Sequence, residues 1–163
     1  MDDLTDTDKS HLLRSIALAH AAVDRGSRPF GSVLVDGREQ VVAESYSTQI
    51  EDRDWTAHAE MKVLRAAGKI LSWDELARVT IYASGEPCPM CAAAIYWCNV
   101  RRLVFGLDEV AMRDFRRSHA QGAGIDMSCR EVLSRSPRNI EVIGPALIAE
   151  ATAPHTRVWK SPA

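Results

Sequence analysis

Short β-branched segments alternate with helix-like segments along most of the chain, and this alternation restricts its fold more than any other feature. Residues 31–45 contain two β-branched runs separated by Asp36-Gly37, which predicts an antiparallel hairpin. Further strands are predicted at 78–84, 101–107 and 139–145, and helices at 10–26, 57–70 and 87–98. Because alternating elements build layered folds, we expect an α/β fold, a three-layer α/β/α sandwich with a mixed five-stranded sheet.

The C-terminal third has weaker patterns. Residues 107–139 show no clear period, so we expect a short helix and a loop there. Residues 146–160 predict a final helix or tail that is broken near Pro154, because proline removes a helix hydrogen bond. We expect one domain over 1–163, with residues 145–163 forming a C-terminal lid or tail.

Composition excludes several classes of protein. The chain of 163 residues is 46% hydrophobic and 26% charged, as in globular proteins, and it contains no apolar run long enough for a membrane span. Its start, MDDLTDTDKS, is acidic and lacks the pattern of an export signal, so we expect a cytoplasmic location and reduced cysteines. The net charge of −2 argues against bulk electrostatic binding of nucleic acid.

Two cysteines stand three positions apart in GEPCPMCAAAIYW, residues 85–97. Cys88 and Cys91 lie in the first turn of a predicted helix, where their side chains share one side and can bind the same ion. A third possible ligand, His58, precedes another predicted helix, with Glu60 two positions later. If the strands ahead of these two helices are neighbours, the helix N-termini meet at one edge of the sheet and the three side chains converge.

One nitrogen and two sulfur ligands suit Zn²⁺, and three protein ligands leave a fourth position for water. Zinc lowers the pKa of such a water to roughly 7, which makes it nucleophilic at neutral pH. Glu60 is placed to take a proton from this water and return it to a leaving nitrogen. The pattern therefore points to hydrolytic deamination.

Other interpretations of these residues are weaker. A cytosolic CxxC pair can be a redox site, but that role requires no upstream HxE sequence. A structural zinc site needs a fourth ligand, and Cys98 is two helical turns beyond Cys91. We expect Cys98 and Cys129 to be buried apolar groups and the remaining histidines to be ordinary polar or half-buried residues: His11, His20, His119 and His155.

His58-Ala59-Glu60 with Pro87-Cys88-Pro89-Met90-Cys91 resembles the zinc signature of the cytidine-deaminase superfamily. The PFG sequence at residues 29–31 and AIYW at 94–97 are similar to the branch that contains guanine, cytosine and tRNA adenosine deaminases. The resemblance implies a five-stranded α/β/α fold, usually dimeric, with His58, Cys88 and Cys91 as zinc ligands and Glu60 as catalytic proton shuttle.

The resemblance also implies contacts to a substrate. This branch commonly has an Asn eleven positions before the zinc His, where the present chain has Ser47. Phe30, in the PFG sequence, and Ala59, between His58 and Glu60, are also expected to contact the substrate. The lid is expected to contribute Asp114 and Phe115 from a 107–119 loop, and Trp159 from the 155–159 segment.

We therefore expect a zinc-dependent deaminase of a small nucleobase or nucleoside, with guanine as the first candidate. Because Ser47 alters the usual recognition, cytosine, isocytosine and a guanosine-type nucleoside are alternatives. A tRNA adenosine deaminase is another alternative, because five arginines could form a basic rim that binds RNA: Arg101, Arg102, Arg113, Arg116 and Arg117. Acidic residues are interspersed among these arginines, however, which is typical of a solvated surface. A zinc-binding module without activity is disfavoured because it would not need Glu60.

Overall fold

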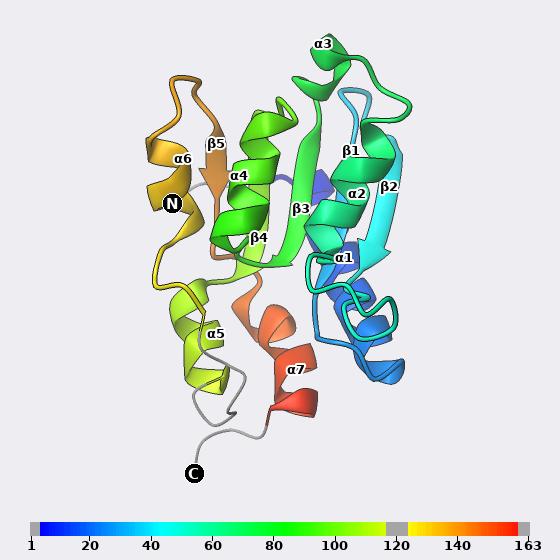
Figure 1. Ribbon diagram of the computed structural model, residues 1–163, viewed down its shortest axis with the longest axis vertical. Coiled ribbons are helices and arrows are strands. Elements are labelled where there is room, and N and C mark those ends of the chain that lie inside the picture. Colours follow the sequence, from blue (N-terminus) through cyan, green and yellow to red (C-terminus); the bar gives the residue numbers. More distant parts are fainter. Residues whose placement is uncertain (1–3, 117–123, 160–163) are drawn as a thin grey trace.

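The computed structural model describes residues 4–116 and 124–159 and contains one mixed five-stranded sheet with helices on both faces (Figure 1). The strands lie in the order β2-β1-β3-β4-β5. They are β1 Gly31–Val35, β2 Val41–Tyr46, β3 Thr80–Gly85, β4 Arg102–Leu107 and β5 Glu141–Ile143. The helices are α1 Asp6–Asp24, α2 Ala59–Ala67, α3 Trp73–Leu76, α4 Pro89–Trp97, α5 Glu109–Arg116, α6 Cys129–Ser134 and α7 Ile148–Val158.

The sheet separates two apolar cores, which confirms the predicted layered α/β fold. Strand side chains alternate between the faces, so that Val33 and Val35 of β1 face one core while Leu34 faces the other. The core around Leu34 packs against α2, α4 and α6. The core around Val33 packs against α1, α5 and α7.

Helix α1 is fixed at its start by Asp8. The Asp8 carboxylate and the Thr5 side chain form a capping box, which supplies partners for N–H groups at the helix start. The same buried carboxylate pairs with Arg102 of β4 at 2.7 Å and accepts a hydrogen bond from the Tyr82 hydroxyl of β3 at 2.8 Å. These bonds outweigh the effect of burial and hold the pKa of Asp8 well below its usual range. Asp8 therefore connects α1 to the centre of the sheet.

Strands β1 and β2 are antiparallel, as the hairpin pattern predicted, and β3, β4 and β5 are parallel. The parallel strands end at the same edge of the sheet, and the N–H of Glu86 donates to Leu107 O at 2.7 Å just past β3 and β4. Figure 1 shows α5 and α7 beyond this edge, below the starts of α2 and α4.

The strands ahead of α2 and α4 are not neighbours, so the condition we set for the two helix starts to meet is not fulfilled. Helix α2 follows β2 and α4 follows β3, and β1 lies between these strands. The two helix starts still meet, because the 47–58 segment carries the chain back from β2. Its path is fixed by hydrogen bonds from Ser47 N to Phe30 O at 2.9 Å and from Thr48 N to Ala57 O at 3.1 Å.

The expectations for the C-terminal third hold in part. The short helix expected within 107–139 is present, but it spans Glu109 to Arg116 and so occupies the segment predicted as a 107–119 loop; Asp108 accepts a hydrogen bond from Ala111 N at its start. Residues 117–119 lie outside the described residues. Helix α7 is continuous through Pro154, which is buried, so packing against the neighbouring elements offsets the hydrogen bond that proline cannot make.

The remaining cysteines and histidines follow the expectations in part. Cys129 is fully buried, whereas Cys98 is only half-buried against the same core. His11 and His20 are half-buried, and His119 lies outside the described residues. His155 differs, because it is fully buried. Within the described ranges, no helix has the length and apolarity needed to cross a membrane.

Candidate active site

His58, Cys88 and Cys91 converge at the paired starts of α2 and α4. His58 and Cys88 are the N-cap residues of the two helices, both in extended conformation, and Cys91 lies one turn into α4. The His58 Nδ1 atom is 3.7 Å from Cys88 Sγ and 3.5 Å from Cys91 Sγ. The chain therefore brings together all three predicted ligands, although they lie 30 positions or more apart in sequence.

These distances fit a tetrahedral zinc ion. Zn–S and Zn–N bonds of about 2.3 and 2.0–2.1 Å at tetrahedral angles separate nitrogen from sulfur by about 3.6 Å. The three donor atoms lie within 4.8 Å of one another, with Cys91 buried and the other two residues half-buried. The residues present thus could hold Zn²⁺ with one position left for water.

The two thiols differ strongly in acidity in the metal-free chain. A hydrogen bond from Cys91 and another from His58 lower the pKa of Cys88 to about 4, against the opposing effect of burial. The bond to Cys88, together with burial, raises the pKa of Cys91 well above its usual value. The pair therefore holds one thiolate at neutral pH, and a cation that binds both sulfurs displaces the remaining proton.

Glu60 lies directly beside the three ligands. Its side chain is only 5% exposed, and its Oε2 atom is 3.7 Å from Cys91 Sγ. Burial raises the pKa of Glu60, although the charge of His58 acts in the opposite direction. Such a shift brings a carboxyl group closer to the range in which it both accepts and donates protons.

A small cavity opens beside the ligands. Its walls come from the α1–β1 loop, the 47–58 segment, the starts of α2 and α4, and α5. The residues that line it are Arg28, Phe30, Gln49, His58, Glu60, Glu86, Cys88, Glu109, Met112 and Arg116. Sequence reasoning proposed no site role for Arg28, Gln49, Glu86, Glu109 or Met112.

Ser47 lies behind the cavity wall rather than on it. It is 1% exposed, and its hydroxyl donates to Gln49 Oε1 at 3.1 Å. Gln49 also donates through Nε2 to the Trp55 carbonyl at 3.1 Å, which fixes the orientation of its amide. The residue that presents an amide to the cavity is therefore Gln49, two positions after Ser47.

The other predicted contacts divide into two groups. Phe30 lines the cavity, and Ala59 is fully buried between His58 and Glu60. Asp114 is exposed on α5, whose cavity-lining residues are Glu109, Met112 and Arg116.

Phe115 and Trp159 pack around the buried ring of His155. Their ring centroids are 6.1 and 5.2 Å from that of His155, and Phe30 is 5.3 Å from it. The aromatic cluster of Phe30, Phe115, His155 and Trp159 thus connects α5 and α7 to the cavity wall. It closes one side of the site.

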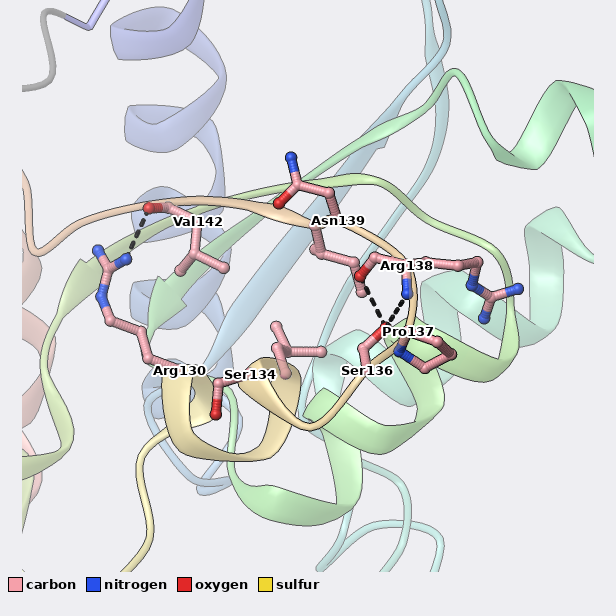
Figure 2. A pocket seen from close by; sticks show the side chains of 9 residues that line it. Arg130, Ser134, Ser136, Pro137, Arg138, Asn139 and Val142 are labelled. Carbon is pink, nitrogen blue, oxygen red and sulfur yellow. Dashed lines mark hydrogen bonds between the residues drawn. The ribbon is translucent and has the colours of Figure 1, made fainter.

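A larger cavity of about 440 Å³ lies between α6 and β5 and carries no comparable chemistry. Figure 2 shows Arg130 bonded to the Val142 carbonyl and Ser136 bonded to Arg138. Arg138 also donates to Asn99 at 3.3 Å. Several of these polar groups thus have hydrogen-bond partners, whereas the three candidate metal ligands lie at the smaller cavity.

Residues 5–107 match the family described as the cytidine and deoxycytidylate deaminase zinc-binding region. The chain belongs to this deaminase family. The match includes the starts of α2 and α4 and the three residues that could hold zinc, His58, Cys88 and Cys91. The family consists of zinc-dependent hydrolases.

The names of related proteins in this family indicate different substrates. The chain is 34% identical over 158 residues to "Probable cytosine deaminase" of Schizosaccharomyces pombe, covering 96% of this chain and 95% of the relative. It is 37% identical over 102 residues to the tRNA-specific adenosine deaminase of Haemophilus influenzae, covering 63% and 59% of the two chains. The structure of guanine deaminase from Bacillus subtilis superposes with a TM-score of 0.63 at 26% identity, covering 98% of this chain and 96% of that one.

Proposed function

We propose that the chain hydrolytically deaminates a nucleobase or related amino-heterocycle, with the conversion of guanine to xanthine and ammonia as the first candidate. The observation that carries the proposal is the buried carboxylate of Glu60 beside three residues that could hold zinc. A metal site of purely structural function would not need an acid–base group at this position.

The residues have separate roles in this proposal. Zinc would be held by His58, Cys88 and Cys91 and would supply the Lewis acidity that makes a water nucleophilic at neutral pH. Glu60 accepts a proton from that water and delivers it to the amino nitrogen. The water oxygen bonds to the ring carbon, the C–N bond breaks, and the nitrogen leaves as ammonia. The second proton of the water ends on a ring nitrogen of the product.

Two observations support a small substrate over tRNA. Helix α5 and Phe30 line the small cavity beside Glu60, and Phe30 packs against His155 and Trp159 of the C-terminal segment. The predicted basic rim is also largely neutralised by ion pairs, which join Arg102 to Asp8, Arg113 to Asp126 and Arg116 to Glu109. Arg101 donates to Asn99, and Arg117 lies outside the described residues.

Cytosine is the second candidate, and similarity over the whole chain favours it. The S. pombe relative matches 158 residues, so the similarity extends past the zinc-binding region into the segments that form α5 to α7. Isocytosine and a guanosine-type nucleoside remain alternatives with the same reacting group.

We also propose that the protein acts in the cytoplasm as a homodimer. Exposed apolar side chains on the α3–α4 side support self-association, among them Trp73 at 54% and Trp97 at 72% exposure. Analytical ultracentrifugation of the wild type and of Trp97→Glu tests the dimer: a monomeric variant supports it, and a monomeric wild type contradicts it.

Ammonia release by the zinc-loaded protein tests the substrate. The panel is guanine, guanosine, cytosine, isocytosine, adenine and an anticodon stem-loop RNA. Turnover of guanine above the other compounds supports the first candidate, and turnover of cytosine without guanine supports the second. Turnover of the RNA alone contradicts the proposal of a small substrate.

A further inference from the structure

Arg28 lines the same cavity as His58 and Glu60. It lies in the loop between α1 and β1 and is half-buried. Among residues 4–116 and 124–159, none of the ion pairs includes Arg28. An arginine that lines a cavity and forms no ion pair is unusual, because a guanidinium that loses water needs other partners.

The acids of the cavity are already engaged with other groups. Glu86 accepts hydrogen bonds from the backbone N–H groups of Glu109 at 2.9 Å and Cys129 at 2.8 Å. Glu109 pairs with Arg116 at 2.5 Å, and both side chains are at most 15% exposed. Glu60 is the proposed proton shuttle. Among the described residues, Arg28 therefore forms no ion pair with these acids, and its guanidinium instead lies over the ring of Trp55.

The electrostatic surroundings of Arg28 are unfavourable to its charge. Burial, and then the charge of Arg116, lowers the pKa of Arg28. The charge of Arg28 also acts on His58, so the guanidinium lies close to the metal site. An anion bound between Arg28 and the site would relieve this repulsion.

The backbone at Arg28 is held by hydrogen bonds before any ligand binds, and the guanidinium has a contact with an aromatic ring. Its carbonyl accepts a hydrogen bond from Phe30 N at 2.8 Å, and the neighbouring Ser27 hydroxyl donates to Ser47 O at 2.6 Å. The guanidinium carbon lies 5.8 Å from the ring centroid of Trp55. A side chain held in this way loses less entropy when it binds a ligand than a free surface arginine would.

We propose that Arg28 binds a negatively charged group, a phosphate or a carboxylate, carried by the amino-heterocycle that reacts at the metal site. This inference rests on the proposed function and narrows its substrate class: within each set of related amino-heterocycles, the anionic member is the better substrate. Arginine suits this role because its planar group forms two parallel hydrogen bonds to a phosphate or carboxylate.

The first test measures anion binding without turnover. The melting temperature of the zinc-loaded protein is followed against inorganic phosphate and against acetate, with chloride at matched ionic strength. The variants are Arg28→Gln and a control, Arg25→Gln, whose exposed arginine lies 5.5 Å from the Tyr46 ring centroid instead of lining the cavity. We expect phosphate or acetate to raise the melting temperature of the wild type and the control but not of Arg28→Gln. Equal shifts in all three proteins, or no shift in the wild type, would overturn the proposal.

The second test compares matched neutral and anionic compounds. The pairs are cytidine with cytidine 5′-monophosphate, guanosine with its 5′-monophosphate, and cytosine with 5-carboxycytosine, so that phosphate and carboxylate are distinguished. We expect the wild type to prefer the anionic member in kcat/KM by roughly 10- to 100-fold, the range of a charged hydrogen bond. Arg28→Gln should abolish this preference, and Arg28→Lys, which keeps the charge but not the two parallel bonds, should retain part of it.

A wild type that prefers the neutral members, or an Arg28→Gln variant that loses activity on both members equally, would contradict an anion-binding role. If no compound released ammonia, the proposed deamination would be overturned instead. The melting-temperature test with phosphate and acetate would then by itself decide whether Arg28 binds an anion.

Discussion

The carboxylate of Glu86 accepts a hydrogen bond from the backbone N–H of Cys129 at 2.8 Å, across 43 positions of sequence. Its other oxygen accepts from Glu109 N at 2.9 Å. Glu86 stands two positions before Cys88 and thus joins the starts of α5 and α6 to the segment that carries the metal ligands.

Replacement of Glu86 should therefore loosen the cover of the site. Glu86→Ala leaves two buried N–H groups without partners and should lower the free energy of unfolding by about 2–3 kcal/mol, measured by urea denaturation. Glu86→Gln keeps one acceptor oxygen and should cost roughly half as much. The exposed Glu51→Ala is the control. Equal stability of Glu86→Ala and the control would show that these hydrogen bonds contribute nothing.

Removal of one thiolate ligand should remove the metal. Cys88→Ala leaves one nitrogen and one sulfur donor, so we expect zinc content and ammonia release to fall together. Cys98→Ala, which removes a half-buried thiol outside the ligand group, should keep both. Metal analysis of the purified variants checks this. A fully zinc-loaded Cys88→Ala protein would rule out the ligand set.

The metal-free chain should have one unusually reactive thiol. Because the pKa of Cys88 is lowered to about 4, its thiolate persists above that pH. Alkylation of Cys88 by iodoacetamide should then proceed at nearly the same rate at pH 6 and pH 8. An ordinary thiol, with a pKa of about 8.5, becomes roughly 75-fold faster over this interval. Peptide mapping by mass spectrometry measures the rate, and zinc should suppress it. A rise as steep as that of an ordinary thiol contradicts the prediction.

His155 should make the protein less stable in mild acid. Burial, and then the charge of Arg116, lowers the pKa of His155 to about 3, whereas a histidine in the unfolded chain titrates near 6.5. Between these values the unfolded state binds a proton that the folded state does not, so stability falls as the pH falls through this window. At pH 5 the loss is about 2 kcal/mol.

Unfolding at pH 7 and pH 5 measures this loss. His155→Phe, which keeps an aromatic ring in the cluster, should show a smaller difference between the two pH values than the wild type. The half-buried His20→Phe is the control. An unchanged pH dependence in His155→Phe would mean that this histidine does not titrate as its burial requires.

The layered fold could be predicted from the sequence because β-branched runs and helix patterns are local. The candidate ligand set could also be proposed from the sequence, since the HxE and PCxxC sequences place each residue at a helix start. The way in which His58 comes close to Cys88 and Cys91 could not be predicted. Strand β1 separates β2 from β3, and the path of residues 47–58 depends on long-range hydrogen bonds such as Ser47 N to Phe30 O.

The segments that form α5 and α7 were the least predictable part of the fold. Helix α5 begins at a recognisable cap, Asp108, but its polar sequence obscured the helix, and the burial of Pro154 in α7 depends on tertiary packing. Arg28 and Gln49 carry no motif. Their places on the cavity wall follow from the fold alone.

The most direct test of the account compares ammonia release by the zinc-loaded wild type and by Glu60→Gln, with the exposed Glu51→Gln as control. The substitution keeps the three ligands and the shape of the side chain but removes the group that transfers protons. We predict full zinc content and a fall in turnover of roughly 10²- to 10⁴-fold for Glu60→Gln, with no change in the control. Near wild-type ammonia release by the zinc-loaded Glu60→Gln protein would contradict the assignment of Glu60 as the proton shuttle.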